Sequence, residues 1–260
     1  MISILTPARG RFDQTKSVIE STYQLADYPD EVEMIFRVDE DDPDLTPRIG
    51  ELRRYPNIKW LVGDKMEGYA SLDVMVNQMC AESNGDLLLT WGNDAWFVDQ
   101  GWDSQYSKWK ADDIAVVQIA KDDKNGLATQ FPLITRRVYD ILGHYCLHTS
   151  IDDYISWVGI RAGCNYYSDV RVRHDHTEGD YIAEEKELRV SGEYDGGIGI
   201  RTSFWMLENQ KKIAEDAMNL TIPEGHHRGA DFEMLKIRQS GDYRLCEFYG
   251  WKTLPWSWDD

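Results

Sequence analysis

Polar side chains that could do chemistry follow several apolar runs of the chain. The run Leu87–Thr90 leads into Asn93 and Asp94, and a second run ends at Asp39. The first run, Ile2–Leu5, is followed by four residues that could contact a ligand: Thr6, Pro7, Arg9 and Arg11. Carboxylate and amide oxygens can bind a divalent cation, and arginines can bind phosphate groups. Each carboxylate taken alone could equally be an ordinary turn residue.

An acidic pair, Asp152 and Asp153, opens a predicted helix that spans Ile151–Ala162. A carboxylate at a helix start stays ionised near neutral pH, so either residue could be the base that takes a proton from a hydroxyl. The segment Ser150–Asp153 also fits the S-x-x-D signature of a helix N-cap, which stabilises a helix without any catalytic role. Both interpretations remain open.

Two histidines and two tryptophans could add binding groups. His174 and His176 lie two residues apart on a predicted strand, so their side chains share one face and could bind a metal. They could equally form a polar strand face. Trp96 and Trp102 lie on a predicted turn close to Asp94, where an aromatic face could stack on a sugar ring. Both tryptophans could instead be core residues.

The elements that must position these side chains alternate between strands and helices. We expect strands at Ile2–Leu5, Val32–Asp39, Ile58–Asp64, Asp86–Thr90, Ile114–Ala120 and Asp169–His176. We expect helices at Arg11–Ala26, Tyr69–Ala81, Arg137–Leu142, Ile151–Ala162 and Ser203–Leu220. This order is typical of an α/β domain with a mostly parallel, doubly wound sheet. Ligands bind such a sheet beyond the carboxyl ends of its strands, so the polar residues should meet there.

Composition limits the class of protein. The 260 residues favour a main domain at residues 1–177, with a C-terminal helical and loop appendage at 178–260 packed on it. The net charge of −18 repels a phosphate backbone, so nucleic-acid binding is not expected. Four scattered cysteines indicate reduced thiols. No apolar run reaches the roughly 20 residues of a membrane span, so we expect a cytoplasmic protein.

Several of these stretches, in order, resemble the GT-A fold nucleotide-sugar glycosyltransferases, and in particular glycosyltransferase family 2. The segments are "SILTPARGR", "EMIFRVDEDDP", "VNQMCAESNGDLLLTWGNDAWFVDQGWD", "IDDYISWVGIRAG" and "HDH", which together extend from residue 2 to about residue 176. Each motif is short, so the specificity comes from their order. One departure is that the metal motif reads Asn93-Asp94-Ala95 instead of Asp-x-Asp.

The resemblance implies transfer of a sugar from a nucleoside diphosphate sugar to a hydroxyl acceptor, assisted by Mn²⁺ or Mg²⁺. Asp94 would bind the metal, and His174 or His176 would complete the site. Asp153 matches the second position of the family's acidic pair and is favoured over Asp152 as the base. The residues implied for the donor site are Thr6, Pro7, Arg9, Arg11, Asp39, Asn77 and Asn93. Those considered for acceptor stacking are Trp96 and Trp102.

A base candidate without an obvious nucleophile favours inversion at the transferred sugar. The alternative is a non-catalytic nucleotide- or sugar-binding module on the same sheet, which the missing first carboxylate of the metal motif would explain. A nucleotidyltransferase ranks last, because it needs a phosphate loop rich in glycine and lysine, and "TPARGRFDQTK" holds one of each.

Overall fold

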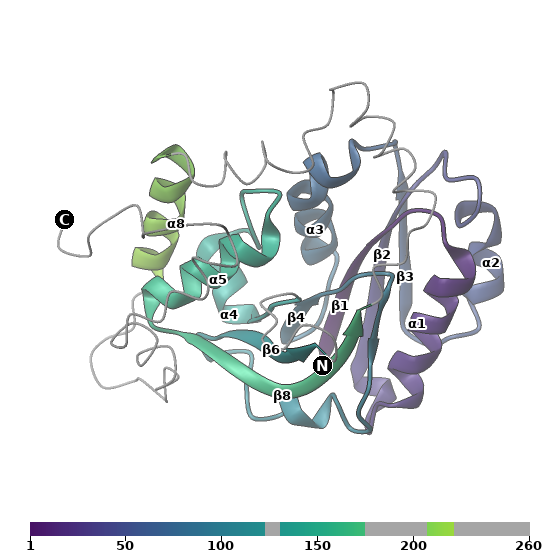
Figure 1. The fold of residues 1–260 in the computed structure, drawn as a ribbon, viewed down its shortest axis with the longest axis horizontal. Helices are drawn as coiled ribbons and strands as arrows, with labels where there is room; N and C mark the ends of the chain where they lie inside the picture. Colours follow the sequence, from purple (N-terminus) through teal and green to yellow (C-terminus); the bar gives the residue numbers. More distant parts are fainter. Residues whose placement is uncertain (123–130, 175–206, 221–260) are drawn as a thin grey trace.

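The structure is a computed structural model that describes residues 1–122, 131–174 and 207–220, and a curved sheet forms its centre (Figure 1). Within these ranges the sheet has eight strands in the order β3-β2-β1-β4-β7-β6-β8-β5. The strands are β1 (Ile2–Ala8), β2 (Val32–Asp39), β3 (Ile58–Gly63), β4 (Leu87–Thr90), β5 (Ala95–Phe97), β6 (Val116–Asp122), β7 (Leu133–Thr135) and β8 (Asn165–His174). The α-helices are α1 (Phe12–Gln24), α2 (Ile49–Leu52), α3 (Leu72–Ala81), α4 (Arg136–Leu142), α5 (Ile151–Ala162) and α8 (Leu207–Asn219). Short 3-10 turns are η1 (Pro29–Glu31), η2 (Thr46–Arg48), η3 (Gly68–Ser71) and η4 (Ser104–Tyr106).

Parallel pairing around β1 brings three predicted site segments to one edge of the sheet. Ile2 pairs with Val32 of β2 and with Leu87 of β4, and both pairings continue in parallel toward Asp39 and Asp94. The pairs β2–β3 and β6–β8 are also parallel. The pairs β4–β7, β6–β7 and β5–β8 are antiparallel. The predicted α/β class with a mostly parallel sheet is confirmed.

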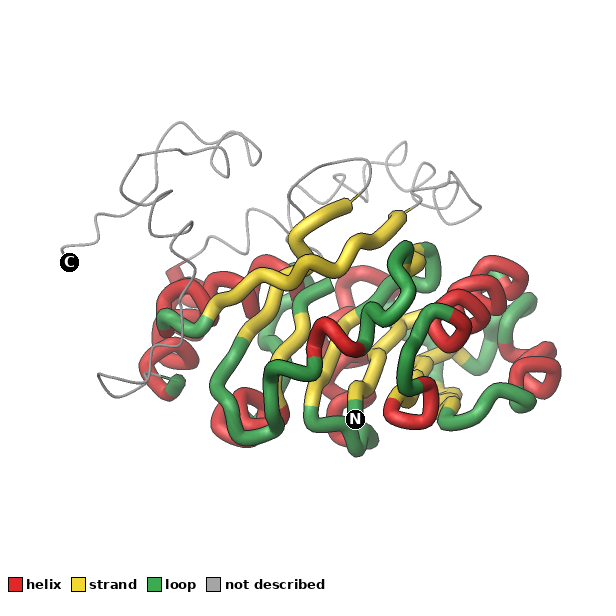
Figure 2. Tube along the Cα trace, turned by 90° about the horizontal axis from the view of Figure 1, so that it is seen from below, coloured by secondary structure: helices red, strands yellow, loops and turns green. Residues whose placement is uncertain are grey.

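Helices cover both faces of the sheet because successive strand residues point to opposite sides. Ile4 and Phe36 are buried in a core shared with α1 and α2, whereas Leu5 and Ile35 are buried in a core shared with α3, α5 and α8. In Figure 1, α1 and α2 lie to the right of the sheet and α3, α5 and α8 to the left. Figure 2 shows the strands as a twisted layer between helices. The sheet is doubly wound, as predicted.

The first strand is longer than predicted, and two short strands were not predicted. β1 continues past Leu5 to Ala8, paired there with β2 alone. Pro7 is tolerated in β1 because its missing N–H would have no partner there. The Leu5 carbonyl accepts the Trp91 N–H, so the backbone groups of Leu5 and of Pro7, two residues later, point to the β4 side. β4 has ended by that point, so no hydrogen bond is lost. The unpredicted strands β5 and β7 have three residues each, too few to show an alternating pattern.

Helix α8 is the described part of the predicted appendage, and it packs on α5. The Tyr154 hydroxyl donates to Asp216 Oδ2 at 2.5 Å, and His144 Nε2 lies 3.5 Å from the same oxygen. Ile213 and Leu220 are buried in the core that contains α5. The boundary between residues 1–177 and 178–260 stays a prediction, because residues 175–206 and 221–260 lie outside the described part of the chain.

The described cysteines and helices bear on two further expectations. Cys80, Cys146 and Cys164 are free and buried, and burial raises the pKa of each thiol, which makes them unreactive core residues. Cys246 lies outside the described ranges.

None of the described helices has both the length and the apolarity needed to cross a bilayer. The cytoplasmic location stays a prediction.

Candidate functional site

Asp39, the last residue of β2, is buried and held by three donors. Arg9 Nη1 donates to Asp39 Oδ2 at 2.7 Å, while Arg37 Nη1 at 3.4 Å and the Met66 backbone N–H at 3.2 Å donate to Oδ1. Arg9 also donates to Asp41 at 2.8 Å, and this bond is the main cause that raises the pKa of Arg9. Arg9 is therefore a fixed cation between two carboxylates. Because a carboxylate has about four acceptor positions, Asp39 retains one for a ligand.

The loop between β1 and α1 carries both predicted arginines on a strained backbone. Gly10 has φ 61° and Arg11 has φ 57°, a region that only glycine adopts without cost. The acidic turn after β2 holds this loop, since the Gly10 N–H donates to Asp42 Oδ2 at 2.5 Å and the Phe12 N–H donates to Asp44 Oδ2 at 2.8 Å. Two carboxylates of the acidic turn therefore have a structural role.

Asp94 follows β4 and lies between a guanidinium and an imidazole. Arg11 Nη1 donates to Asp94 Oδ2 at 3.2 Å, and His174 Nε2 lies 3.1 Å from Asp94 Oδ1. His174 ends β8 and pairs there with Ala95 of β5. Gly92 leaves room for the carboxylate, because a Cβ at that position would lie 2.6 Å from Asp94 Oδ1. Of the three residues predicted for the metal, the structure thus brings two together, while His176 lies outside the described residues.

The spacing of Asp94 Oδ1 and His174 Nε2 fits two ligands of one cation. Two ligands about 2.1 Å from an octahedral ion, at right angles, lie about 3.0 Å apart, and these atoms lie 3.1 Å apart. A mixed oxygen and nitrogen donor set suits Mn²⁺ better than Mg²⁺. Residues 1–122, 131–174 and 207–220 contain no group of three or more His, Cys, Asp or Glu side chains that could hold a metal. Further ligands would come from phosphate, water or residues outside these ranges.

Asp152, in the first turn of α5, shares this environment. Its pKa is raised to about 7, mainly by burial and then by the charge of Asp153, while the nearby Phe131 backbone N–H and the charge of His174 oppose the rise. The expectation that both carboxylates of the pair are fully ionised near neutral pH therefore does not hold for Asp152. A pKa near the working pH suits a general base. The resemblance implies Asp153 as the base, and the order of the two carboxylates stays a prediction.

The Ser150 side chain does not cap helix α5. Ser150 is the N-cap residue, but its side chain makes no capping hydrogen bond. Its backbone N–H donates instead to His148 Nδ1 at 3.0 Å. Burial lowers the pKa of His148, which keeps this nitrogen available as an acceptor. Ser150 thus occupies the N-cap position that the S-x-x-D signature predicts, without a capping bond from its side chain, and the role of the acidic pair stays a prediction.

Of the residues predicted for the donor site, Asn77 makes contacts within the fold and Thr6 is buried. Asn77 on α3 donates from Nδ2 to the Cys146 carbonyl at 2.7 Å, and its Oδ1 accepts the Tyr145 N–H at 2.7 Å. Both ends of the amide thus hold the loop that precedes α5. Thr6 is fully buried within β1. The other residues predicted for the donor site lie at the ends of β1, β2 and β4: Pro7, Arg9, Arg11, Asp39 and Asn93.

Trp102, predicted to stack on an acceptor, is a core residue. Its side chain is fully buried, and its ring stacks on Phe97 with a centroid distance of 3.8 Å. Its Nε1 donates to the Thr22 carbonyl at 3.0 Å, which ties this loop to α1. With both faces covered, the ring cannot contact a sugar, so the acceptor prediction for Trp102 is wrong.

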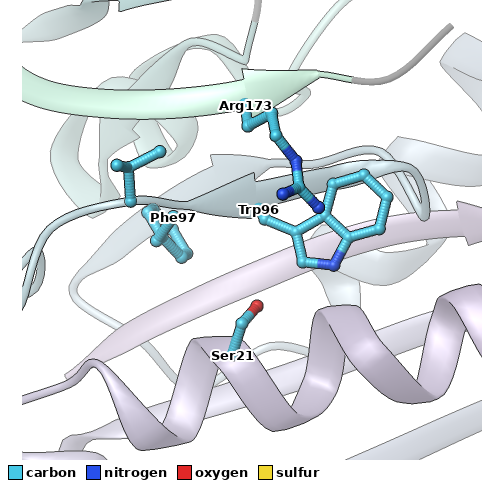
Figure 3. Close-up of a pocket in the computed structure, with 5 residues that line it drawn as sticks. Ser21, Trp96, Phe97 and Arg173 are labelled. Atoms are coloured by element: carbon cyan, nitrogen blue, oxygen red, sulfur yellow. The ribbon is translucent and has the colours of Figure 1, made fainter. Parts of the chain in front are cut away.

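Trp96 lies in β5 beside a pocket of about 260 Å³ (Figure 3). The Arg173 guanidinium lies 4.6 Å from the centre of the Trp96 ring, and Trp96 Nε1 donates to Ser17 Oγ at 3.2 Å. Trp96 pairs with Arg173 whereas Ala95 pairs with His174, so Trp96 and His174 face opposite sides of the β5–β8 ribbon. The acceptor role of Trp96 stays a prediction. The pocket is lined by Ser21, Trp96, Phe97, Val98 and Arg173.

Phe131 was not predicted as a residue of the site. It has φ 56°, and its ring centre lies 5.0 Å from that of His174. The following Pro132 signals a turn. No sequence pattern shows that the ring before this proline packs on a histidine at the end of a later strand.

Sequence comparison finds no matching family model and no matching curated protein. Solved structures do match. The mannosyltransferase PcManGT from Pyrobaculum calidifontis, in complex with GDP-Man and Mn²⁺, has a TM-score of 0.57 at 15% identity, with 94% of this chain and 80% of that chain covered. TarS 1–349 from S. aureus with UDP-GlcNAc has a TM-score of 0.56 at 12% identity, with 94% and 75% covered. The same fragment with UDP has a TM-score of 0.52 at 11% identity, with 98% and 75% covered.

At identities this low, the structural similarity establishes the fold alone, and the reaction must be argued from the site itself. The ordered strand-end motifs and the doubly wound sheet agree with that fold. The chain therefore has the GT-A fold of the nucleotide-sugar glycosyltransferases that its sequence resembles.

Proposed function

We propose that this protein is a glycosyltransferase that moves a sugar from a nucleoside diphosphate sugar to a hydroxyl acceptor. One observation carries the proposal: on a GT-A fold, the Asp94–His174 pair lies at the carboxyl edge of the sheet with Arg11 bonded to it, and the charge of His174 acts on Asp152. This arrangement combines groups for binding an anionic leaving group with a group that can accept a proton. The solved structures of similar fold were determined with GDP-Man and with UDP-GlcNAc, which supports the same class of donor.

The nucleoside would lie against Asp39 and the diphosphate against the two arginines. Asp39 retains one acceptor position for a nucleoside N–H beside the bonds from Arg9, Arg37 and Met66. Arg9 and Arg11 are two residues apart on one loop, so both can donate charge-assisted hydrogen bonds to phosphate oxygens. These cations would receive an anionic donor locally, although the whole chain has a net charge of −18.

Asp94 and His174 would hold the divalent cation, and their mixed donor set favours Mn²⁺ over Mg²⁺. When bound, such an ion supplies positive charge that neutralises the departing diphosphate. Arg11 already donates to Asp94 Oδ2, which leaves Oδ1 and His174 Nε2 as the facing pair of ligand atoms. The Mn²⁺ complex of PcManGT supports this assignment by analogy of fold.

Asp152 would act as the base in a single displacement. It takes the proton from the acceptor hydroxyl as that oxygen forms a bond to the anomeric carbon. The bond from this carbon to the donor phosphate breaks, and the leaving diphosphate takes the electron pair. One displacement inverts the configuration at the carbon. A base with a pKa near 7 is half ionised at neutral pH and can cycle between its two forms during turnover.

The rival function is a binding module that holds a nucleotide or sugar without transferring it. The observation in its favour is the single carboxylate in Asn93-Asp94-Ala95, which gives the site fewer acidic ligands than an Asp-x-Asp motif would. Such a module would bind nucleotide but release no sugar, and Asp152→Asn would leave its properties unchanged.

Calorimetry with UDP and GDP, each with and without Mn²⁺, tests the binding step. Wild type should bind one of them in a metal-dependent way, and Asp94→Asn should lose this binding. Asp86→Asn is the matched control. Asp86 lies just before β4, whereas Asp94 lies after it, and the Asp86 side chain is 54% exposed. A panel of nucleotide sugars, read by mass spectrometry for released nucleoside diphosphate, then separates a transferase from a binding module. A wild-type protein that binds neither nucleotide with Mn²⁺ present would rule out the proposal.

A further inference from the structure

Phe131 adopts a backbone conformation that a bulky side chain rarely takes. Its φ of 56° lies in the left-handed region, and its side chain is nonetheless buried. Residues in such conformations persist only where their surroundings hold them, and they gather at functional sites. Because the conformation is unfavourable in itself, a specific set of contacts must impose it.

Hydrogen bonds hold the residue that follows Phe131. The Pro132 carbonyl accepts the Thr90 N–H at 3.2 Å, the Thr90 hydroxyl at 3.2 Å and the Tyr145 hydroxyl at 2.5 Å. Thr90 ends β4, four residues before Asp94, and the Tyr145 N–H is in turn held by Asn77. The end of β4 and the loop before α5 thus both anchor Pro132, the immediate neighbour of Phe131.

This conformation places Phe131 beside the candidate site. Its backbone N–H lowers the pKa of Asp152, against the rise that burial causes. The Phe131 ring meets the His174 ring edge to face, with centroids 5.0 Å apart and planes at 68°. On another side the ring packs on Trp91 at 4.9 Å. Gly92 permits this packing, because a Cβ there would lie 3.4 Å from the Phe131 ring and 2.6 Å from Asp94 Oδ1.

We propose that Phe131 is a positioning residue that sets the orientation of the His174 imidazole through its ring. The inference rests on the proposed function, in which His174 is a metal ligand. Phe131 would act through this side chain and not by contact with the donor or the reacting atoms. Residues outside the ligand set that orient a ligating histidine change metal affinity or activity by about 10–100-fold when they are removed.

Phe131→Gly separates the ring from the backbone. Glycine adopts positive φ freely, so the backbone conformation is kept while the ring is lost. Phe131→Leu keeps apolar bulk beside His174. Tyr106→Ala is the matched control, because Tyr106 is another buried ring and packs on Trp102 and Trp109. All three variants are compared with wild type after their unfolding curves show that each is folded.

The first readout is the NMR signal of the His174 ring protons, which needs neither metal nor donor. Loss of the Phe131 ring current should shift these signals in Phe131→Gly and Phe131→Leu and leave them in place in Tyr106→Ala. The second readout is Mn²⁺ affinity measured by electron paramagnetic resonance with saturating UDP or GDP. It should fall about 10–100-fold in Phe131→Gly, by less than about threefold in Phe131→Leu, and not at all in Tyr106→Ala.

The third readout is donor turnover, in which kcat should fall about 10–100-fold in Phe131→Gly with a donor KM within about threefold of wild type. Unmoved His174 signals, or equal losses of Mn²⁺ affinity in Phe131→Gly and Tyr106→Ala, would overturn the positioning role. A wild type that turns over no donor, with His174 signals that still move in Phe131→Gly, would count against the proposed function and still support the placement of His174 by Phe131.

Discussion

His174 Nε2 lies 3.1 Å from Asp94 Oδ1, although 80 residues separate them in the chain. The contact joins the turn after β4 to the last residue of β8. Neither strand pairs with the other in the sheet, and the link runs through β5, which follows Asp94 directly and pairs with β8. The three-residue strand β5 thus decides whether these two side chains can bind the same ion.

Removing either member of this pair should abolish most metal-dependent nucleotide binding. Asp94→Asn and His174→Ala should each weaken Mn²⁺ binding in the presence of UDP or GDP by about 100-fold or more, equivalent to about 3 kcal/mol. The double variant should be scarcely worse than either single one, because both act on one ion. Mn²⁺ titrations followed by electron paramagnetic resonance measure this. Strictly additive losses would show that the two residues act independently.

Arg9→Ala should destabilise the fold more than Arg11→Ala. The partner of Arg9, Asp39, is 5% exposed, whereas the partner of Arg11, Asp94, is 19% exposed. Removing Arg9 takes the closest hydrogen-bond donor away from the buried Asp39 carboxylate, which should lower the free energy of unfolding by about 2–3 kcal/mol. Water can partly solvate Asp94, so Arg11→Ala should cost about 1 kcal/mol or less. Urea unfolding measures both, with the exposed Arg54→Ala as the neutral reference.

The stability of the free protein should depend on the ionisation of Asp152. Burial raises the pKa of Asp152 to about 7 in the folded state, so the folded protein binds this proton more tightly than the unfolded chain does. The free energy of unfolding therefore falls as pH rises from about 4 toward about 7 and then levels off. Asp152→Asn should remove this fall in the free energy of unfolding, because asparagine does not ionise.

The stability of Asp152→Asn relative to wild type should consequently rise by about 2–3 kcal/mol between pH 5 and pH 8. Urea unfolding at four pH values in this range, without metal or nucleotide, tests the sign and size of the change. Asp86→Asn should follow the wild-type curve throughout, since Asp86 is exposed. Parallel curves for Asp152→Asn and wild type would contradict the raised pKa.

Changes at Trp102 should affect stability and leave the chemistry of the folded protein intact. Trp102→Phe loses the hydrogen bond to Thr22 and should cost about 1–2 kcal/mol, while Trp102→Ala also leaves a cavity and should cost about 3–5 kcal/mol. Nucleotide affinity per folded molecule should stay within about twofold. Thermal unfolding and calorimetry on the same samples measure the two effects. An acceptor-specific loss of activity in Trp102→Phe would restore the stacking role.

The strand-end motifs were readable from the sequence because each is local. The apolar run Leu87–Thr90 and its polar exit at Asp94 are consecutive, as are β2 and Asp39, and parallel pairing needs only that the strands alternate with helices. The helix at Ile151–Ala162 was predicted with the bounds that the structure has, because its apolar spacing and the glycine after it are both local signals.

Other assignments depend on contacts between distant segments, which the sequence does not show. Asn77 looks like a ligand-binding amide until the loop at Tyr145 and Cys146 is seen to use both of its ends. Trp96 and Trp102 are both tryptophans and lie close together in the sequence, so the sequence does not distinguish them. Only the packing on Phe97 and α1 shows that Trp102 has no open face.

The sequence by itself determined the α/β class, the doubly wound sheet and the edge at which the charged residues meet, because periodicity and strand–helix alternation act over short stretches of chain. The tertiary structure decided which of those charged residues touch. It placed His174 on Asp94, raised the pKa of Asp152 by burial, and packed the Phe131 ring against His174. These outcomes depend on distances between segments that are far apart in the chain, and a side chain's partner and solvation exist only once those segments have packed together.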